Sequence, residues 1–135
     1  MSKTAIVTGA TAGIGEATTV ELANLGYDLI LTGRRKERLK KLKSNLEADY
    51  DISVSIHAFD IRQKAEVENF CRNEIGGRKI EVLVNNAGLA AGLSPLHEGD
   101  VDDWEKMIDT NVKGLLFITR EIAPRMVSQQ SGHII

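Results

Sequence analysis

The sequence predicts a doubly wound α/β domain, in which helices cover both faces of one parallel sheet. Short apolar runs alternate along the chain with apolar residues at helical spacing, and the connections between them are short. Such alternation builds β-α-β units, whose crossovers are right-handed and whose strands are therefore parallel. Residues 1–135 make one domain at most, since a domain typically holds roughly 100–200 residues.

The first half of the chain contains three predicted strands and two predicted helices. Ala5–Val7 and Leu29–Leu31 are continuous apolar runs, typical of strands that are buried on both faces. Residues 52–58 alternate between apolar and polar, so we expect this strand near a sheet edge. The first helix ends at Gly26, and the second is highly charged. Their apolar stripes are expected at Ile14, Ala17, Thr18, Leu22 and Leu25, and at Leu39, Leu42 and Leu46.

The second half repeats the pattern and contains one long helix. A helix is predicted up to Gly76, followed by a fourth strand at 80–84. After a glycine-rich loop we expect a helix over 101–128, which Pro124 should kink or end. Residues 132–135 begin a fifth apolar run. The stripes of these two helices are Val67, Phe70, Cys71 and Ile75, and Val101, Trp104, Ile108, Val112, Leu115, Ile118, Ile122 and Met126.

The composition excludes several classes of protein. With 17 basic and 19 acidic side chains, the formal charge of −2 gives no general attraction to nucleic acid or to anionic lipid. No apolar run approaches the roughly 18 residues of a membrane span, and the N-terminus does not resemble a signal peptide. A single cysteine suits a reducing compartment, so we expect a cytoplasmic protein.

The histidines and the cysteine predict no metal site and no nucleophile. His57, His97 and His133 lack the spacing of metal ligands, and we expect His57 and His133 to be plain surface or sheet-edge residues. Cys71 falls on an apolar stripe, which favours a place in the core.

Two charge runs interrupt the mixed surface pattern. Residues 34–43 hold seven basic side chains, and residues 98–109 hold six acidic ones. Such runs are typical of solvated helix faces. Arg34 and Arg35 are the exception, because they follow directly on the second strand.

The loop Thr8–Gly15 joins the first strand to the first helix and is the leading candidate site. Its glycines stand at positions 9, 13 and 15, which differs from the generic G-x-G-x-x-G spacing. Glycine lets the backbone pass close to a pyrophosphate, and the free N–H groups of a helix N-terminus attract phosphate. A tight turn that needs positive φ is the structural alternative. The position between a buried strand and a helix favours a dinucleotide site.

The end of the second strand indicates which dinucleotide is bound. An acidic residue usually holds the free ribose 2′-OH of NAD at this place. The strand's only acid, Asp28, stands at its opposite end, whereas Arg34 and Arg35 follow Gly33 at the carboxyl end. A guanidinium matches a 2′-phosphate in charge and in geometry. The sequence therefore predicts NADP as the cofactor.

With these features the chain resembles the classical short-chain dehydrogenases/reductases, a Rossmann-like family. Thr8–Gly15 matches the family's T-G-x-x-x-G-I-G loop, and Asn85–Gly88 matches its N-N-A-G motif after the fourth strand. Asp60 follows the third strand, where members hold the adenine amino group, and Asn111 matches the helix Asn that organises a catalytic water chain. The resemblance covers the whole given chain and implies the strand order 3-2-1-4-5.

The resemblance also implies a role for each matching residue. The two arginines would meet the 2′-phosphate, and Asp60 would accept from adenine with Ile61 against the ring. Asn85 would tie the fourth strand to the sheet. Taken alone, Asp60 could be a helix N-cap and the Asn pair a turn. The residues that would line the pyrophosphate and the riboses are Gly9, Ala12, Gly13, Ile14, Gly15, Asn86, Ala87 and Gly88.

Membership of this family implies an oxidoreductase that transfers a hydride between NADP(H) and a small alcohol or carbonyl substrate. Trp104 and the runs 88–90, 107–111 and 132–135 resemble the NADP-dependent serine and 3-hydroxy-acid dehydrogenase group, which makes a 3-hydroxy acid the expected substrate. The family's chemistry needs a Ser and a Tyr-x-x-x-Lys pair. Neither Tyr27 nor Tyr50 has a lysine at that spacing, so Asn111 alone represents the four catalytic positions.

We therefore expect the cofactor-binding part of a longer dehydrogenase, truncated within its fifth strand and inactive by itself. A sheet edge and an apolar patch would be exposed in such a chain. The helix over 101–128 corresponds to one that pairs across the family's oligomer interface, which favours a homo-oligomer. The alternative is a dinucleotide-binding module without catalysis, acting as a sensor or as an interaction protein.

Overall fold

The parallel sheet predicted from the apolar runs is present in the computed structural model, which describes residues 2–135. Its strand order is β3-β2-β1-β4-β5, so the predicted fold class and strand order are confirmed. Neighbouring strands pair in parallel, for example Ala5 with Leu29 on one side and with Val82 on the other. The strands are β1 (Thr4–Thr8), β2 (Asp28–Gly33), β3 (Val54–Ala58), β4 (Val82–Val84) and β5 (His133–Ile134).

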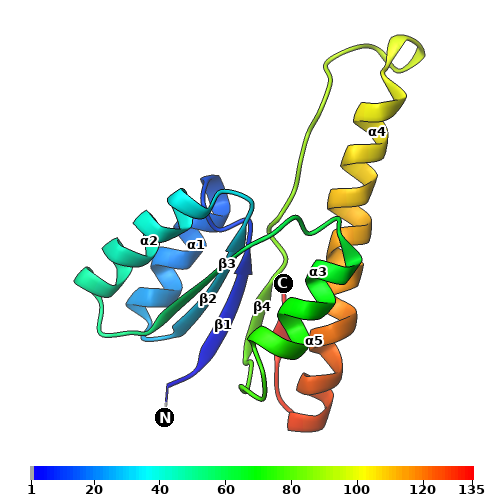
Figure 1. Ribbon diagram of the computed structural model, residues 1–135. Coiled ribbons are helices and arrows are strands. Elements are labelled where there is room, and N and C mark those ends of the chain that lie inside the picture. Colours follow the sequence, from blue (N-terminus) through cyan, green and yellow to red (C-terminus); the bar gives the residue numbers. More distant parts are fainter. Residues whose placement is uncertain (1) are drawn as a thin grey trace.

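Helices cover both faces of this sheet (Figure 1). On one face lie α1 (Gly13–Asn24) and α2 (Lys36–Asp49). The other face carries α3 (Lys64–Asn69), its π-helical continuation η1 (Phe70–Glu74), and α5 (Leu115–Gln129). In the connection from β4 the chain forms a short 3₁₀ turn η2 (Leu96–Glu98) and then α4 (Val101–Ile108), which lies beyond the end of the sheet.

Alternate residues of the central strands supply two separate cores. Ile6, Ile30 and Leu83 point to the face with α3 and α5, where Phe70 and Ile122 are buried against them. The residues between them point to the other face: Ala5, Val7, Leu29, Leu31 and Val84 pack with the α2 stripe Leu39, Leu42 and Leu46. β1 and β2 are thus covered on both sides, as their continuous apolar runs predicted.

The predicted apolar stripe of α1 is wrong at most of its positions, and only Leu22 packs partly buried against the core. Ile14 and Leu25 are exposed, with 79% and 70% of their surface accessible. The helix instead buries its small residues Gly15, Thr19 and Ala23, and the Thr19 hydroxyl donates to the Gly15 carbonyl at 2.7 Å. Small side chains allow this helix to approach the sheet closely, and a search for large apolar residues passes over such a face.

The long helix predicted over 101–128 is three consecutive segments. α4 is followed by the π-helical segment η3 (Asp109–Gly114) and then by α5, which continues through Pro124 to Gln129. Of the two effects expected of Pro124, an end of the regular helix is therefore wrong, and the irregular part lies upstream, in η3. Only the last part of the predicted stripe, Ile118, Ile122 and Met126, packs on the sheet. Val101, Ile108 and Val112 project beyond it and are about half exposed, at 56%, 53% and 51%.

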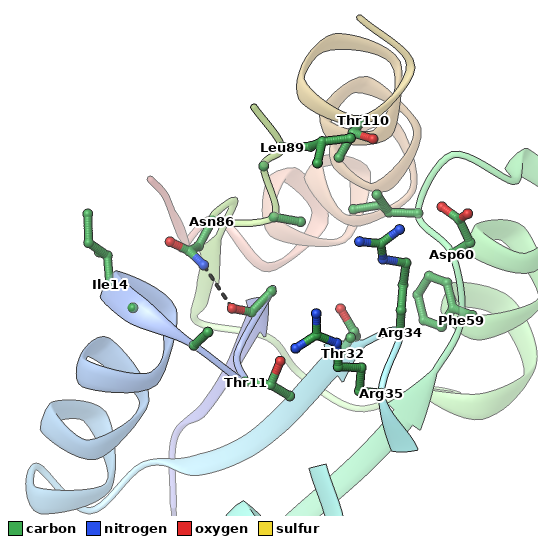
Figure 2. A pocket seen from close by; sticks show the side chains of 17 residues that line it. Thr11, Ile14, Thr32, Arg34, Arg35, Phe59, Asp60, Asn86, Leu89 and Thr110 are labelled. Atoms are coloured by element: carbon green, nitrogen blue, oxygen red, sulfur yellow. Dashed lines mark hydrogen bonds between the residues drawn. The ribbon is translucent and has the colours of Figure 1, made fainter. Parts of the chain in front are cut away.

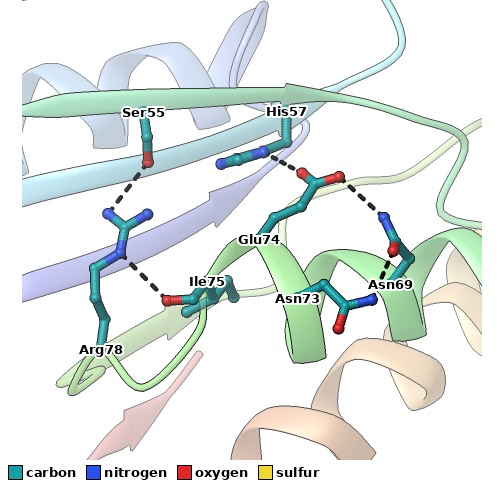
Figure 3. A network of polar contacts seen from close by, with 7 residues as sticks. All are labelled: Ser55, His57, Asn69, Asn73, Glu74, Ile75 and Arg78. Atoms are coloured by element: carbon teal, nitrogen blue, oxygen red, sulfur yellow. Dashed lines mark hydrogen bonds and ion pairs between the residues drawn. The ribbon is translucent and has the colours of Figure 1, made fainter.

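His57 lies on the edge strand β3, as one of the two expectations had it, but its side chain is not a plain surface group. Its side chain is only 16% exposed, its Nδ1 atom pairs with the Glu74 carboxylate of η1, and its ring lies 5.0 Å from that of Phe70. Figure 3 shows the polar network, in which Arg78 adds a 3.4 Å contact to the Ser55 hydroxyl. The polar alternation of β3 thus reflects contacts to η1 as well as its edge position. His133, in contrast, is exposed on β5 as predicted.

The predicted core position of Cys71 is confirmed. Cys71 is fully buried, and burial raises the pKa of its thiol to about 12. Within residues 2–135, no three potential metal-ligating side chains gather in one place. In the same part of the chain, no helix is both long enough and apolar enough to cross a membrane.

Candidate functional site

The site begins where β1 and β4 end side by side. The Thr8 hydroxyl accepts hydrogen bonds from the backbone N–H groups of Asn86 and Ala87, at 3.1 and 2.9 Å, and donates to the Val84 carbonyl at 3.3 Å. Thr8 is fully buried. These bonds hold the turn after β4 against the glycine loop after β1. In an open α/β sheet, the crevice at such a switch in strand order is the usual place for a ligand.

Two glycines of the loop are required by this close approach. A Cβ at Gly9, whose φ is +62°, would lie 2.9 Å from the Ala87 Cα atom. One at Gly15 would lie 2.3 Å from both the Gly9 carbonyl oxygen and the Asn86 Nδ2 atom. That same amide donates to the Gly9 carbonyl at 2.9 Å, the bond drawn in Figure 2. The loop and the turn after β4 therefore pack backbone to backbone.

A cavity of about 420 Å³ opens beside this junction, at the carboxyl ends of the strands. Its lining comes from the glycine loop, the end of β2, the segment after β3, the turn after β4 and the start of η3 (Figure 2). The predicted site residues that line it are Gly9, Ala12, Gly13, Ile14, Arg34, Arg35, Asp60, Ile61, Asn86, Ala87 and Gly88. The sequence reasoning missed Thr11, Thr32, Gly33, Phe59, Leu89 and Thr110.

Gly15 and Asn111 stand apart from that lining. Gly15 is buried behind the loop and acts through packing. Asn111 lies in η3, and its side chain both accepts from the Leu89 N–H and donates to the Leu89 carbonyl, each at 2.8 Å. It thereby attaches the chain after β4 to the long helix, while its neighbour Thr110 faces the cavity. π-Helical turns often occur at functional sites.

The N-terminus of α1 opens toward this cavity. Among residues 2–135, no side chain caps it: Ala12 is in the N-cap position, and Ala12, Gly13 and Ile14 all line the cavity. The first N–H groups of a helix have no partner within the helix, and they carry its positive dipole. This end of α1 is therefore suited to bind an anion.

Two arginines form the opposite wall. Figure 2 shows Arg34 and Arg35 extending from the end of β2, with Arg34 toward the side that holds Asp60. Both are exposed to solvent. Asp28 lies at the other end of β2, where it accepts from the Ser53 N–H at 2.7 Å. As predicted, the rim next to the glycine loop is positive.

Asp60 is held by an ion pair that the sequence did not reveal. Its carboxylate accepts from Arg62 Nε at 3.0 Å and from Nη2 at 2.6 Å, and from the Arg62 backbone N–H at 3.0 Å. These bonds lower the pKa of Asp60 below its ordinary value, so near neutral pH it is a charged acceptor. Because α3 begins at Lys64, after the N-cap Gln63, Asp60 is not a helix cap. Its partner Arg62 compensates the negative charge beside an anion site.

Asn85 differs in part from the role that the resemblance implied. Its backbone N–H donates to the Ile135 carbonyl at 2.7 Å, which joins β4 to the strand beside it. Its side chain, however, donates to the Thr119 hydroxyl of α5 at 3.1 Å. The side chain thus links the end of β4 to a helix, and only the backbone links it to the sheet.

Comparison with known proteins agrees with this architecture. Residues 3–135 match the sequence model for short chain dehydrogenases. The chain belongs to this family. It is 47% identical, over 96% of its length, to the NADP-dependent 3-hydroxy acid dehydrogenase YdfG of Salmonella typhi, and 46% identical to YdfG of Escherichia coli K12. The chain spans about half (51%) of the length of these curated relatives.

Solved structures give the same assignment. The closed form of a serine dehydrogenase complexed with NADP+ has a TM-score of 0.87 and 45% identity, and the match covers 97% of this chain and 52% of that one. A metagenomic short-chain oxidoreductase in complex with NADP has a TM-score of 0.91 and 32% identity, over 98% of this chain and 60% of that one.

The packing role of Gly15 can be tested by Gly15→Ala. Because the added Cβ would come within 2.3 Å of backbone, the loop must shift, and we expect a loss of about 1–3 kcal/mol in the free energy of unfolding. Gly77→Ala is the matched control, since nothing lies within 4 Å of its added Cβ. Urea unfolding followed by circular dichroism measures both. Equal stability of the two variants would contradict the packing role.

Proposed function

We propose that this chain binds NADP(H) and forms the cofactor site of an oxidoreductase that transfers a hydride between NADP(H) and a small alcohol or carbonyl substrate. The observation that carries the proposal is the meeting of Arg34 and Arg35 with the uncapped start of α1 around one cavity. That arrangement supplies two anion sites, one for a pyrophosphate and one for a 2′-phosphate. The NADP dependence of the relatives supports the same cofactor.

Each part of the dinucleotide has a matching group in the cavity. Gly9, Ala12, Gly13 and Ile14 would receive the pyrophosphate, since their backbone lines the cavity at the helix N-terminus. Gly15 would support them by its packing against Gly9. NADP(H), when bound, supplies or accepts the hydride; the chain's own residues bind and orient it.

The adenosine would lie between the segments after β3 and β4. The charged Asp60 would accept from the adenine amino group, with Ile61 against the ring. Asn86, Ala87 and Gly88 would border the riboses, since they line the wall between the glycine loop and η3. Asn111 would act as the family's helix asparagine, and it holds Leu89 in that wall.

We propose a small 3-hydroxy acid as the substrate class, from the relatives that carry this activity in their names. The proton transfer would require the family's Tyr-x-x-x-Lys pair. Tyr27 and Tyr50 pack against the core under α1 and α2 and do not line the cavity. The proposal therefore assigns cofactor binding to the residues that line the cavity, and it assigns proton transfer to a tyrosine other than Tyr27 and Tyr50.

We also propose a homo-oligomer that forms through the surface of α4, η3 and the start of α5. Ile108, Val112, Leu115 and Leu116 expose between 38% and 56% of their surface along this stretch. A second copy of the same helix would cover these apolar side chains.

The cofactor choice is tested by the double variant Arg34→Ala/Arg35→Ala. Charge-assisted hydrogen bonds contribute about 1.5–3 kcal/mol each, so we expect NADPH affinity to fall by at least about tenfold per arginine. NADH affinity should change far less, because NADH lacks the 2′-phosphate. Fluorescence titration of both cofactors measures this. Lys106→Ala/Arg120→Ala removes the same charge elsewhere and is the control; equal losses of NADPH and NADH affinity would refute the assignment.

The proposal that this chain binds the cofactor but lacks the tyrosine for proton transfer is tested with the chain itself. Mixed with NADP+ and L-serine or another 3-hydroxy acid, it should bind the cofactor and form no NADPH, as followed by absorbance. Measurable turnover would contradict the assignment of proton transfer to a different tyrosine. If the natural coding sequence encodes no Ser and no Tyr-x-x-x-Lys pair, cofactor binding without turnover would instead favour the non-catalytic binding module.

The oligomer is tested by Val112→Glu. A carboxylate placed in the proposed apolar contact should shift the mass measured by analytical ultracentrifugation toward the monomer. Val127→Glu is the control, because Val127 is also exposed (76%) but lies near the other end of α5. A wild-type chain that sediments as a monomer would rule out the proposed contact.

A further inference from the structure

The positive charge at the cavity continues past the two arginines along α2. Residues 34–43 hold seven basic side chains and one carboxylate, a net charge of +6. Since the whole chain has a formal charge of −2, the remaining 125 residues carry −8. Six acids and one lysine lie within residues 98–109, in and around α4. The cavity is lined by Arg34 and Arg35, which directly precede the basic helix α2, and by Thr110, which follows the acidic helix α4; Figure 1 shows these two helices on different sides of the sheet.

This distribution works against the helix that carries it. The N-terminus of a helix favours acidic side chains and its C-terminus favours basic ones, by about 0.3–1 kcal/mol each. In α2 the order is reversed: Lys36 and Arg38 stand in the first turn, and the last turn has no basic residue. Glu37 is the one favourable charge of that first turn. Local helix stability therefore does not account for the basic residues at the start of α2.

Much of this charge is also uncompensated. Lys40 pairs with Glu37 at 3.4 Å, and Lys43 lies 3.9 Å from Glu47. By contrast, Lys36, Arg38 and Lys41 are exposed and form no ion pair with any residue in the range 2–135. Unlike Arg34 and Arg35, these three side chains do not line the cavity. They lie on the first turns of α2, the helix that begins directly after the cavity-lining Arg34 and Arg35.

We propose that Lys36, Arg38 and Lys41 form a steering surface that accelerates the capture of NADP(H) without contacting it in the complex. The inference rests on the proposed function, since the ligand is the same cofactor. A pyrophosphate together with a 2′-phosphate monoester brings about three to four negative charges. At about 10 mM ionic strength the Debye length is roughly 30 Å, so the charges of one helix act together on such an anion.

A steering surface is expected to raise the association rate of the cofactor and to leave its dissociation rate unchanged. Fields of this kind typically raise association rates by about 10–10³-fold, and salt removes the gain. The dissociation rate depends on the short-range contacts of the bound state, which Arg34, Arg35 and the glycine loop would supply. The acidic residues around α4 would add direction, because they repel the phosphates from the opposite rim.

The test uses the triple variant Lys36→Gln/Arg38→Gln/Lys41→Gln and stopped-flow NADPH fluorescence. At about 10 mM ionic strength we expect the association rate to fall by roughly tenfold with an unchanged dissociation rate. At about 1 M salt, where the Debye length is roughly 3 Å, the difference should vanish. Glutamine is a good helix former, and the changes at Lys36 and Arg38 remove cations from the first turn of α2, so thermal unfolding should show equal or higher stability.

The control variant Lys3→Gln/Lys79→Gln/Arg120→Gln removes the same charge from exposed positions outside α2 and α4. It should keep nearly the wild-type association rate. Equal losses in the two variants would show an effect of net charge alone and would overturn the steering surface. An unchanged association rate in the α2 variant would also overturn it. So would a faster dissociation rate in that variant, because it would indicate direct contact with the bound cofactor. A wild-type chain that captures no NADPH at either salt concentration would overturn the proposed function, and this inference with it.

Discussion

The hydroxyl of Thr8 holds together the two halves of the site. It lies at the end of β1, yet it bonds to Val84, Asn86 and Ala87, the last two 78 and 79 residues away in the sequence. Because the hydroxyl is fully buried, these partners replace the water that it would otherwise need. The bonds place the turn after β4 directly on the glycine loop. The cavity beside them exists because these two backbones are held this close.

The same closeness explains the residues of α1. A helix that starts in the glycine loop has to lie tight against the strand ends, so its buried face consists of Gly15, Thr19 and Ala23. Larger apolar residues such as Ile14 are displaced to the outside, where Ile14 borders the cavity. Packing and binding are thus parts of one arrangement, since the helix end that the small residues bring to the sheet is also the end that offers free N–H groups.

Beyond this junction, charge organises the surroundings of the cavity. The pairing of Asp60 with Arg62 keeps a charged acceptor near the two arginines that follow β2 without leaving its negative charge uncompensated. The basic start of α2 and the acidic α4 lie on different sides of the sheet. The apolar residues Val101, Ile108 and Val112 of α4 and η3 stay about half exposed, because this stretch extends past the strand ends. These features face outward, where the proposals place the approach of a polyanionic cofactor and the contact with a second copy of the chain.

The sequence by itself determined the strands, their order through the family resemblance, the glycine loop and the arginines after β2. Apart from the strand order, each is a local pattern whose meaning depends on neighbours a few residues away. Only the tertiary structure decided which face of α1 is buried, where the long helix becomes irregular, and that His57 pairs with Glu74. It also decided that Thr8 and Asn111 hold backbone segments together. These facts depend on contacts between distant segments, and a close approach selects small or polar side chains that leave no periodic apolar signal.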